Sequence, residues 1–263
     1  MKTLRALLLG ITISAAWWPI LVESAQPVVV GFDSGAANWV GSSQIGTGSW
    51  NFTGGVARLS FIDTFPIFFD TGTLSNLPSA SSGSFTGNYD AAGIRAIGFS
   101  FLATTVKPSG VVLEIGGVTS VYQRQFSVAA TGVWHHFSAS LASVQEGGWT
   151  NLAGPVGDFA SVRQNVRYVT IKVTRDASAG PRQYLIDNIF LGREPVAGDL
   201  FQPGGSLRLL GEDLQSNLTY FVETAPEVTG TWSVARSFIA TNQTQWVDLT
   251  NDAHRQFWRM RFP

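Results

Sequence analysis

Short runs of alternating apolar and polar residues, separated by turns rich in Gly, Ser, Asn and Pro, follow one another from about residue 28 to residue 192. Alternation with a period of two is typical of strands that bury one face. Eight or more such strands predict two packed antiparallel sheets, a β-sandwich or jelly roll. The predicted strands are Val28–Phe32, Ala57–Phe61, Ala96–Ala103, Gly110–Ile115, Val121–Val128, Trp134–Ser140, Tyr168–Thr174 and Tyr184–Leu191.

Helical patterns are scarce, and the best candidate is the short segment Asp158–Asn165. The strand rhythm stops in a Gly- and Pro-rich stretch, residues 194–205, which we interpret as a linker between a jelly-roll domain (26–193) and a smaller β-sandwich (206–263). The fold class is therefore expected to be all-β. Strands predicted in the second domain are Ser206–Leu210, Leu218–Glu223, Trp232–Ala235, Gln245–Leu249 and Gln256–Phe262.

Residues 1–25 have the pattern of a secretory signal peptide. Lys2 and Arg5 precede the uncharged apolar stretch Ala6–Val22, and small residues follow at a cleavage point after Ser24 or Ala25. An uncleaved anchor is the alternative, because the apolar stretch is close to the ~17 residues that a spanning helix needs. We expect a secreted protein, extracellular or periplasmic and more easily bacterial than animal, with no membrane contact after cleavage.

Composition narrows the function further. Only 13% of the residues are charged, against ~25% in an average domain, and the formal net charge is −1. Nucleic-acid binding needs a basic patch, so we expect no nucleic-acid partner. The absence of cysteine excludes disulfides, thiolate metal sites and cysteine nucleophiles.

Three stretches of the first domain resemble a known family layout: Gly31-Phe32-Asp33-Ser34-Gly35 followed by Trp39, the closing Tyr184-Leu185-Ile186-Asp187-Asn188-Ile189, and the central Gly132-Val133-Trp134-His135-His136-Phe137. The opening and closing stretches resemble those of the jelly rolls of carbohydrate-binding modules and galactose-binding-like domains, and the central stretch is similar to a strand of related secreted bacterial jelly rolls. The resemblance implies a glycan-binding protein. It also implies a structural calcium ion held by Asp33 and Asp187, since hard oxygen ligands suit Ca²⁺. Without calcium, Asp33 would cap a turn and Asp187 would accept hydrogen bonds from a neighbouring loop.

The second domain resembles a fibronectin type III-like β-sandwich that is appended to many secreted bacterial proteins and is mostly non-catalytic. The resemblance rests on Leu207-Arg208-Leu209, Tyr220-Phe221-Val222-Glu223-Thr224, Gly230-Thr231-Trp232 and Phe257-Trp258-Arg259-Met260.

Candidate ligand-binding residues come from the need for aromatic platforms beside polar groups. The strand segment Tyr122, Gln123, Arg124, Gln125 is unusually polar, and alternation places Tyr122 and Arg124 on one face and the two glutamines on the other. Either face could line a groove. Trp149 follows two glycines in an apparent loop and is expected to be exposed, whereas Trp39 and Trp134 are expected in the core.

Catalytic signals are weak. Retaining and inverting glycosidases use two carboxyl groups, and Glu114, Glu146 and Glu194 form no pair two residues apart on a strand. His135 and His136 are adjacent and face opposite sides of their strand. We expect a non-catalytic, lectin-like protein whose partner is a polysaccharide or cell-surface glycan. A structural or adhesive surface protein, and a glycan hydrolase or lyase with an unrecognised site, remain alternatives.

Overall fold

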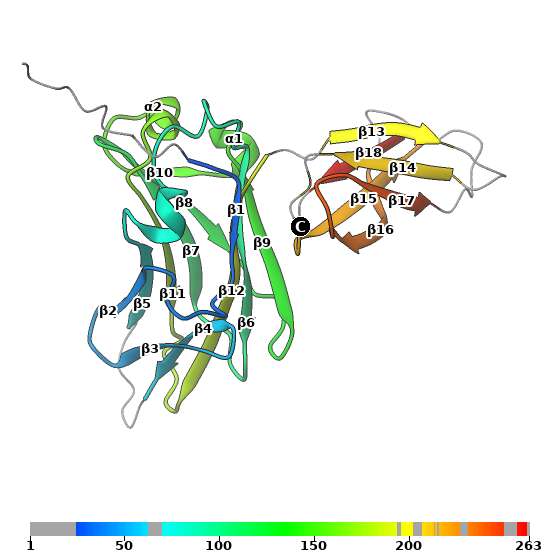
Figure 1. Cartoon of the computed structure of the whole chain (residues 1–263). Helices are drawn as coiled ribbons and strands as arrows, with labels where there is room; N and C mark the ends of the chain where they lie inside the picture. Colours follow the sequence, from blue (N-terminus) through cyan, green and yellow to red (C-terminus); the bar gives the residue numbers. More distant parts are fainter. Residues whose placement is uncertain are drawn as a thin grey trace, which may run out of the picture.

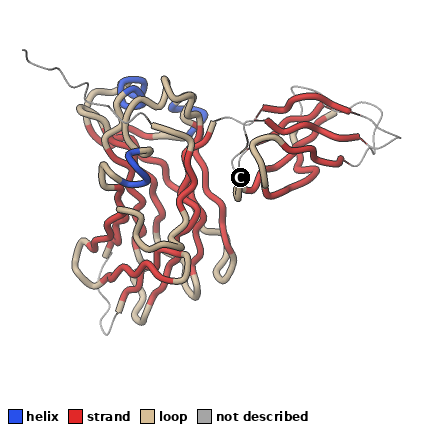
Figure 2. The backbone as a smooth tube through the Cα atoms, in the orientation of Figure 1, coloured by secondary structure: helices blue, strands red, loops and turns tan. Residues whose placement is uncertain are grey.

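The structure, a computed structural model, describes residues 25–62, 70–193, 196–201, 207–212, 214, 216–226, 231–249 and 257–261. The predicted signal peptide, apart from Ala25, lies outside the described residues. Two bodies built almost entirely of strands lie side by side, a larger one followed by a smaller one (Figures 1 and 2). No helix in the described ranges is long and apolar enough to cross a bilayer.

The larger body is a jelly-roll sandwich of two antiparallel sheets, as the alternating pattern predicts. The first sheet has the order β3-β4-β12-β6-β9, with β1 also paired to β12, and the second has the order β10-β8-β7-β11-β5-β2. The strands of the first sheet are β1 (Val28–Val30), β3 (Gly48–Thr53), β4 (Val56–Phe61), β6 (Ala96–Ala103), β9 (Trp134–Ser140) and β12 (Arg182–Gly192). Those of the second are β2 (Trp39–Ser43), β5 (Thr71–Asn76), β7 (Gly110–Gly116), β8 (Val121–Phe126), β10 (Thr150–Ala153) and β11 (Tyr168–Thr174).

The core lies between these sheets and is built from alternate residues of each strand. Leu113 and Ile115 of β7 pack inward with Ile171 of β11, and Phe99 and Phe101 of β6 oppose them from the first sheet. Each fully buried side chain of this size contributes ~1.5–3 kcal/mol to folding through removal of apolar surface from water. The intervening residues of the same strands therefore face outward, where they are free to serve a function.

Helices are short, as expected. The predicted helix appears as α2 (Phe159–Gln164), which buries Phe159 and Val162. A second short helix, α1 (Val144–Gly147), is capped at its N-terminus by Ser143, whose side chain accepts a hydrogen bond from the Glu146 backbone nitrogen. One 3₁₀ turn, η1, spans Ala80–Gly83.

The smaller body consists of two antiparallel three-stranded sheets in its described part, with orders β13-β14-β17 and β16-β15-β18. Its strands are β13 (Val196–Phe201), β14 (Leu207–Glu212), β15 (Thr219–Ala225), β16 (Ser233–Ile239), β17 (Gln245–Leu249) and β18 (Phe257–Arg261). The prediction of a linker over residues 194–205 is wrong in part, because β13 pairs with β14 and belongs to this domain. Backbone pairing there outweighs the turn-forming composition.

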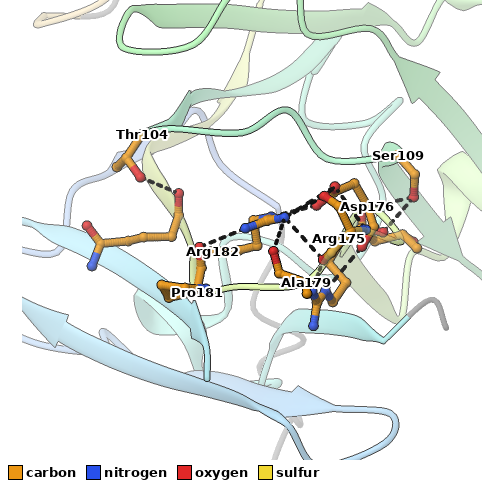
Figure 3. Close-up of polar contacts among 10 residues, drawn as sticks. Thr104, Ser109, Arg175, Asp176, Ala179, Pro181 and Arg182 are labelled. Carbon is orange, nitrogen blue, oxygen red and sulfur yellow. Dashed lines mark hydrogen bonds and ion pairs between the residues drawn. The ribbon is translucent and has the colours of Figure 1, made fainter. Parts of the chain in front are cut away.

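A polar cluster closes the turn between β11 and β12 (Figure 3). The guanidinium Nε of Arg182 donates to Asp176 Oδ1 at 2.6 Å, and Arg175 Nη2 donates to the Ser178 carbonyl at 2.6 Å. The hydrogen bond from Arg182, together with those from Ser178, lowers the pKa of Asp176 to about 2. Both arginines are buried, so the cluster satisfies charges that would otherwise be costly in the interior.

Candidate functional site

Strand β8 separates its polar residues onto two faces, as alternation predicts, but the inward face does not form a ligand platform. Tyr122 is 1% exposed, and its ring centroid lies 4.9 Å from that of Phe159 in the core. Arg124 is half-buried on the same face, stacks over the Phe126 ring at 5.6 Å, and donates to the Gly148 carbonyl at 3.3 Å. Neither Tyr122 nor Arg124 presents an open face, contrary to the expected groove on this side, and ligand binding by these two residues stays a prediction.

The expected solvent exposure of two tryptophans is wrong. Trp149 is 2% exposed, because its ring packs on Phe159 and its indole nitrogen donates to the Ser140 carbonyl at 2.7 Å. The two preceding glycines form the end of helix α1 and turn the ring inward. Trp134, expected in the core, is 40% exposed on the edge strand β9. Trp39 is buried, as predicted.

Gln123 and Gln125 face outward and belong to a larger polar surface. We give the name polar face to eight polar side chains on the outward side of the second sheet: Gln123 and Gln125 of β8, Glu114 of β7, Tyr168, Thr170 and Lys172 of β11, and Thr73 and Ser75 of β5. Register aligns Gln123 with Glu114, Glu114 with Thr170, and Thr170 with Ser75, so one row of polar groups crosses four strands.

An ion pair lies at the middle of the polar face. Lys172 Nζ donates to Glu114 Oε1 at 2.5 Å, and Glu114 is only 4% exposed although it faces outward from the sheet. Beside the pair, the hydroxyl oxygens of Thr170 and Ser75 lie 2.9 Å apart. The row therefore holds a buried carboxylate and two hydroxyls, with the Lys172 ammonium beside it, and these groups can donate and accept hydrogen bonds.

The aromatic member of the polar face is Tyr168. A Cβ atom built on Gly116 of the neighbouring strand would lie 2.1 Å from Cε1 of the Tyr168 ring, so the ring lies across the glycine. Burial, and next the negative charge of Glu114, raise the pKa of Tyr168. Tyr168 stays a neutral hydroxyl donor at neutral pH, next to the ion pair.

The sequence contains only part of the signal for this site. Tyr168 is the first residue of β11, whose predicted bounds are correct, and alternation places it on the same face as Thr170 and Lys172. Nothing in the sequence states that β11 lies between β7 and β5. Glu114 and Tyr168 were therefore missed as site residues.

The carboxylates of Asp33 and Asp187 are brought together. A Cβ atom built on Gly31 would lie 3.4 Å from Asp33 Oδ2 and 3.6 Å from Asp187 Oδ1. Strand β12 has an irregular register here, and Asn188 has a φ of 48°, which forms a bulge that re-aims the side chains. Burial, and also the charge of Asp33, raise the pKa of Asp187.

Two adjacent carboxylates that are partly buried and repel one another are chemically suited to binding a hard cation. Ca²⁺ takes six to eight oxygen ligands, and the described residues hold no group of three or more His, Cys, Asp or Glu side chains that could bind a metal. Backbone carbonyls and water would have to complete the shell. The calcium ion stays a prediction.

No family model and no curated protein matches the chain. Among solved structures, an agarase has a TM-score of 0.42 at 13% identity, over 61% of this chain and 23% of the agarase. A family 11 carbohydrate-binding module from Clostridium thermocellum, in complex with a β-1,3-1,4-mixed-linked tetrasaccharide, has a TM-score of 0.40 at 13% identity, over 64% of this chain and 96% of the module. A module in complex with β-1,4-galactotriose has a TM-score of 0.34 at 18% identity, over 62% of this chain and 94% of the module. Likenesses with TM-scores below 0.5 are too loose to transfer a ligand or an activity.

Proposed function

We propose that the protein is an exported, non-catalytic carbohydrate-binding protein, and that the polar face of its jelly roll is the binding surface. The observation that carries the proposal is the position of the Tyr168 ring, which lies across Gly116, two residues along β11 from Thr170 and so beside the transverse row of polar side chains. Export rests on the leader pattern of residues 1–25.

The chemistry of the polar face suits a sugar. A pyranose presents an apolar C–H surface and a rim of hydroxyl groups, and amphipathic rings such as tyrosine offer one apolar face and one polar tip. Gln123 and Thr170 would bind hydroxyl groups on either side of the Glu114 carboxylate, which accepts hydrogen bonds at several lone pairs. Lys172 holds that carboxylate as part of an ion pair.

The ion pair supports a preference for uncharged glycans. Glu114 is nine-tenths buried, and its charge is balanced by Lys172 alone among the polar-face residues. A uronic acid or sulfated sugar would bring a second anion to a buried carboxylate, at a cost that grows in a poorly solvated site. We expect neutral polysaccharides to bind and polygalacturonate to bind at least tenfold more weakly.

The test is a binding measurement on residues 25–263 with soluble neutral glucans, galactans and xylans, by affinity electrophoresis and then by calorimetry. Tyr168→Ala should weaken binding about tenfold, corresponding to ~1.4 kcal/mol, and Tyr168→Phe should retain most of the affinity. Phe257→Ala is the matched control, since Phe257 is a 45% exposed aromatic residue on the other domain.

Retention of full affinity in Tyr168→Ala would overturn the polar face as the site, and the absence of any glycan binding would overturn the function. The same preparations decide between the alternatives. Release of reducing ends from a bound glycan would identify a hydrolase, and release of unsaturated ends would identify a lyase. Adhesion to cells without glycan binding would favour a structural surface protein.

A further inference from the structure

The outward face of the first sheet carries an aromatic residue that the core does not use. Trp134 is 40% exposed, and the register of β9 with β6 sets it opposite Leu102 and sets His136 opposite Ser100. Residues two apart on a strand share a face and lie ~7 Å apart along it. Trp134 and His136 therefore lie next to one another on the side of the first sheet that faces away from the core.

A cavity of about 200 Å³ adjoins His136, between the two domains. Ser100, His136 and Asn188 line it from the first domain, and Asn217 and Thr219 line it from the second. Its apolar walls include Phe190, Leu218 and Ile239. The volume is below the ~300–1,000 Å³ of pockets for drug-sized ligands, so it fits a single ring with small substituents.

The polar lining of this cavity is uncharged at neutral pH. Ser100 Oγ and His136 Nδ1 lie 3.0 Å apart, and burial, together with the charge of His135, lowers the pKa of His136. Hydroxyl, amide and neutral imidazole groups remain, and these exchange hydrogen bonds with hydroxyl groups without demanding a counter-charge.

Asn188 and Asn217 distinguish the cavity from an ordinary gap between domains. Both have positive φ, 48° and 70°, a conformation that non-glycine residues rarely adopt and that clusters at ligand sites. Their side-chain amides make no hydrogen bond within the described part of the chain. Two amides held at strained backbone positions thus line one small cavity from opposite domains.

We infer that Trp134 and this interdomain cavity form a second glycan-binding site, separate from the polar face, that takes a neutral sugar. One ring would enter the cavity between the domains, with its hydroxyl groups on Asn188, Asn217 and the Ser100–His136 pair. The next ring of the chain would stack on Trp134. Both domains contribute side chains, so the site is complete only in the two-domain protein.

The experiment uses residues 25–263 and four probes: cellotetraose, xylotetraose, β-1,4-galactotetraose and, as a charged comparison, tetragalacturonate. Calorimetry gives the number of equivalents bound. For at least one neutral probe we expect two equivalents. Trp134→Ala and Asn217→Gly should each weaken one of the two by at least tenfold, and Tyr168→Ala should leave that equivalent unchanged.

Matched controls separate binding from folding. Trp246→Ala removes a tryptophan of similar exposure, 38%, from the second domain, and Asn38→Gly replaces another positive-φ asparagine, in the loop before β2. Both controls should keep both equivalents, and glycine accepts the φ of Asn217 without strain. Thermal unfolding of each variant checks that the fold is retained.

Three outcomes overturn the inference: a single equivalent that Tyr168→Ala abolishes, a second equivalent that survives both Trp134→Ala and Asn217→Gly, or no binding of any neutral probe. The first of these would leave the proposed polar face intact. Conversely, one equivalent that is lost in Trp134→Ala and retained in Tyr168→Ala supports the interdomain site and overturns the polar face.

Discussion

The ring of Tyr168 lies across Gly116 on the adjacent strand, and a Cβ atom at Gly116 would stand 2.1 Å from its Cε1. The glycine is thus what allows the aromatic ring to lie close to the sheet on its outward side. Because the two residues pair directly in the antiparallel register of β7 and β11, a change at either one alters the surface that the other presents.

Gly116→Ala should displace the Tyr168 ring and its hydroxyl, and thereby damage the polar face without replacing any of its residues. We expect glycan affinity to fall about tenfold, the equivalent of ~1.4 kcal/mol, and the free energy of unfolding to fall by ~1–3 kcal/mol through overpacking. Calorimetry and urea unfolding measure the two effects. Gly110→Ala is the control on the same strand, since a Cβ there meets nothing within 4 Å. Equal loss in both variants would contradict the role of the Tyr168 ring.

Lys172→Met should destabilise the protein because it leaves Glu114, 4% exposed, without its cationic partner. Removing one partner of a buried ion pair typically costs ~3–5 kcal/mol, and the 35% exposure of the Lys172 side chain brings the expected loss below that range. Urea unfolding of Lys172→Met, Glu114→Gln and the double variant gives the coupling. The double variant should recover part of the stability. Strictly additive losses would contradict the pair.

Stability should depend on pH through Asp187. Its pKa in the folded protein is raised above the usual 3.8, so the folded state binds a proton more tightly than the unfolded state. In calcium-free buffer, the free energy of unfolding contributed by Asp187 should fall as the pH rises from below 3.8 through the raised pKa. Asp187→Asn should flatten this part of the profile and raise stability at neutral pH, as followed by thermal unfolding.

If calcium binds between Asp33 and Asp187, the contribution of Asp187 to the free energy of unfolding should rise with pH instead of falling. With the ion present, both carboxylates become ligands, and wild-type protein should melt at a higher temperature at pH 7 than after EDTA treatment. Asp33→Asn and Asp187→Asn should each abolish the calcium-dependent shift. An unchanged melting temperature on removal of calcium would exclude the site.

Phe190→Ala should weaken the attachment of the second domain. Phe190 is 3% exposed, its ring lies over Gly98, and it packs in the core cluster of the second domain with Leu218 and Tyr220. Loss of a buried phenylalanine typically costs ~3–5 kcal/mol. Hydrogen exchange should accelerate in β15 more than in β7, whereas Phe257→Ala should change neither. Equal protection in β15 of wild type and Phe190→Ala would contradict this interface.

Strands with strong apolar alternation were predictable from the sequence, because a half-buried strand must place a hydrophobic residue at every second position. The bounds of β6, β9, β11 and β17 agree with the prediction at both ends. Four strands made largely of Gly, Ser, Thr and Asn were missed, since turns use the same residues. They are β2, β3, β5 and β10.

The pattern of apolar and polar residues was enough to predict the all-β class, the two-sheet sandwich and the short helix at α2. It also predicted that Tyr122 and Gln123 face opposite sides of their strand. Each of these features depends on periodicity within single segments. Which face of a strand meets the core, and which strand lies next to it, depend on residues far away in the sequence. Burial of Tyr122 and Trp149 around Phe159, exposure of Trp134 at a sheet edge, and the meeting of Tyr168 with Gly116 were therefore decided only by the tertiary structure.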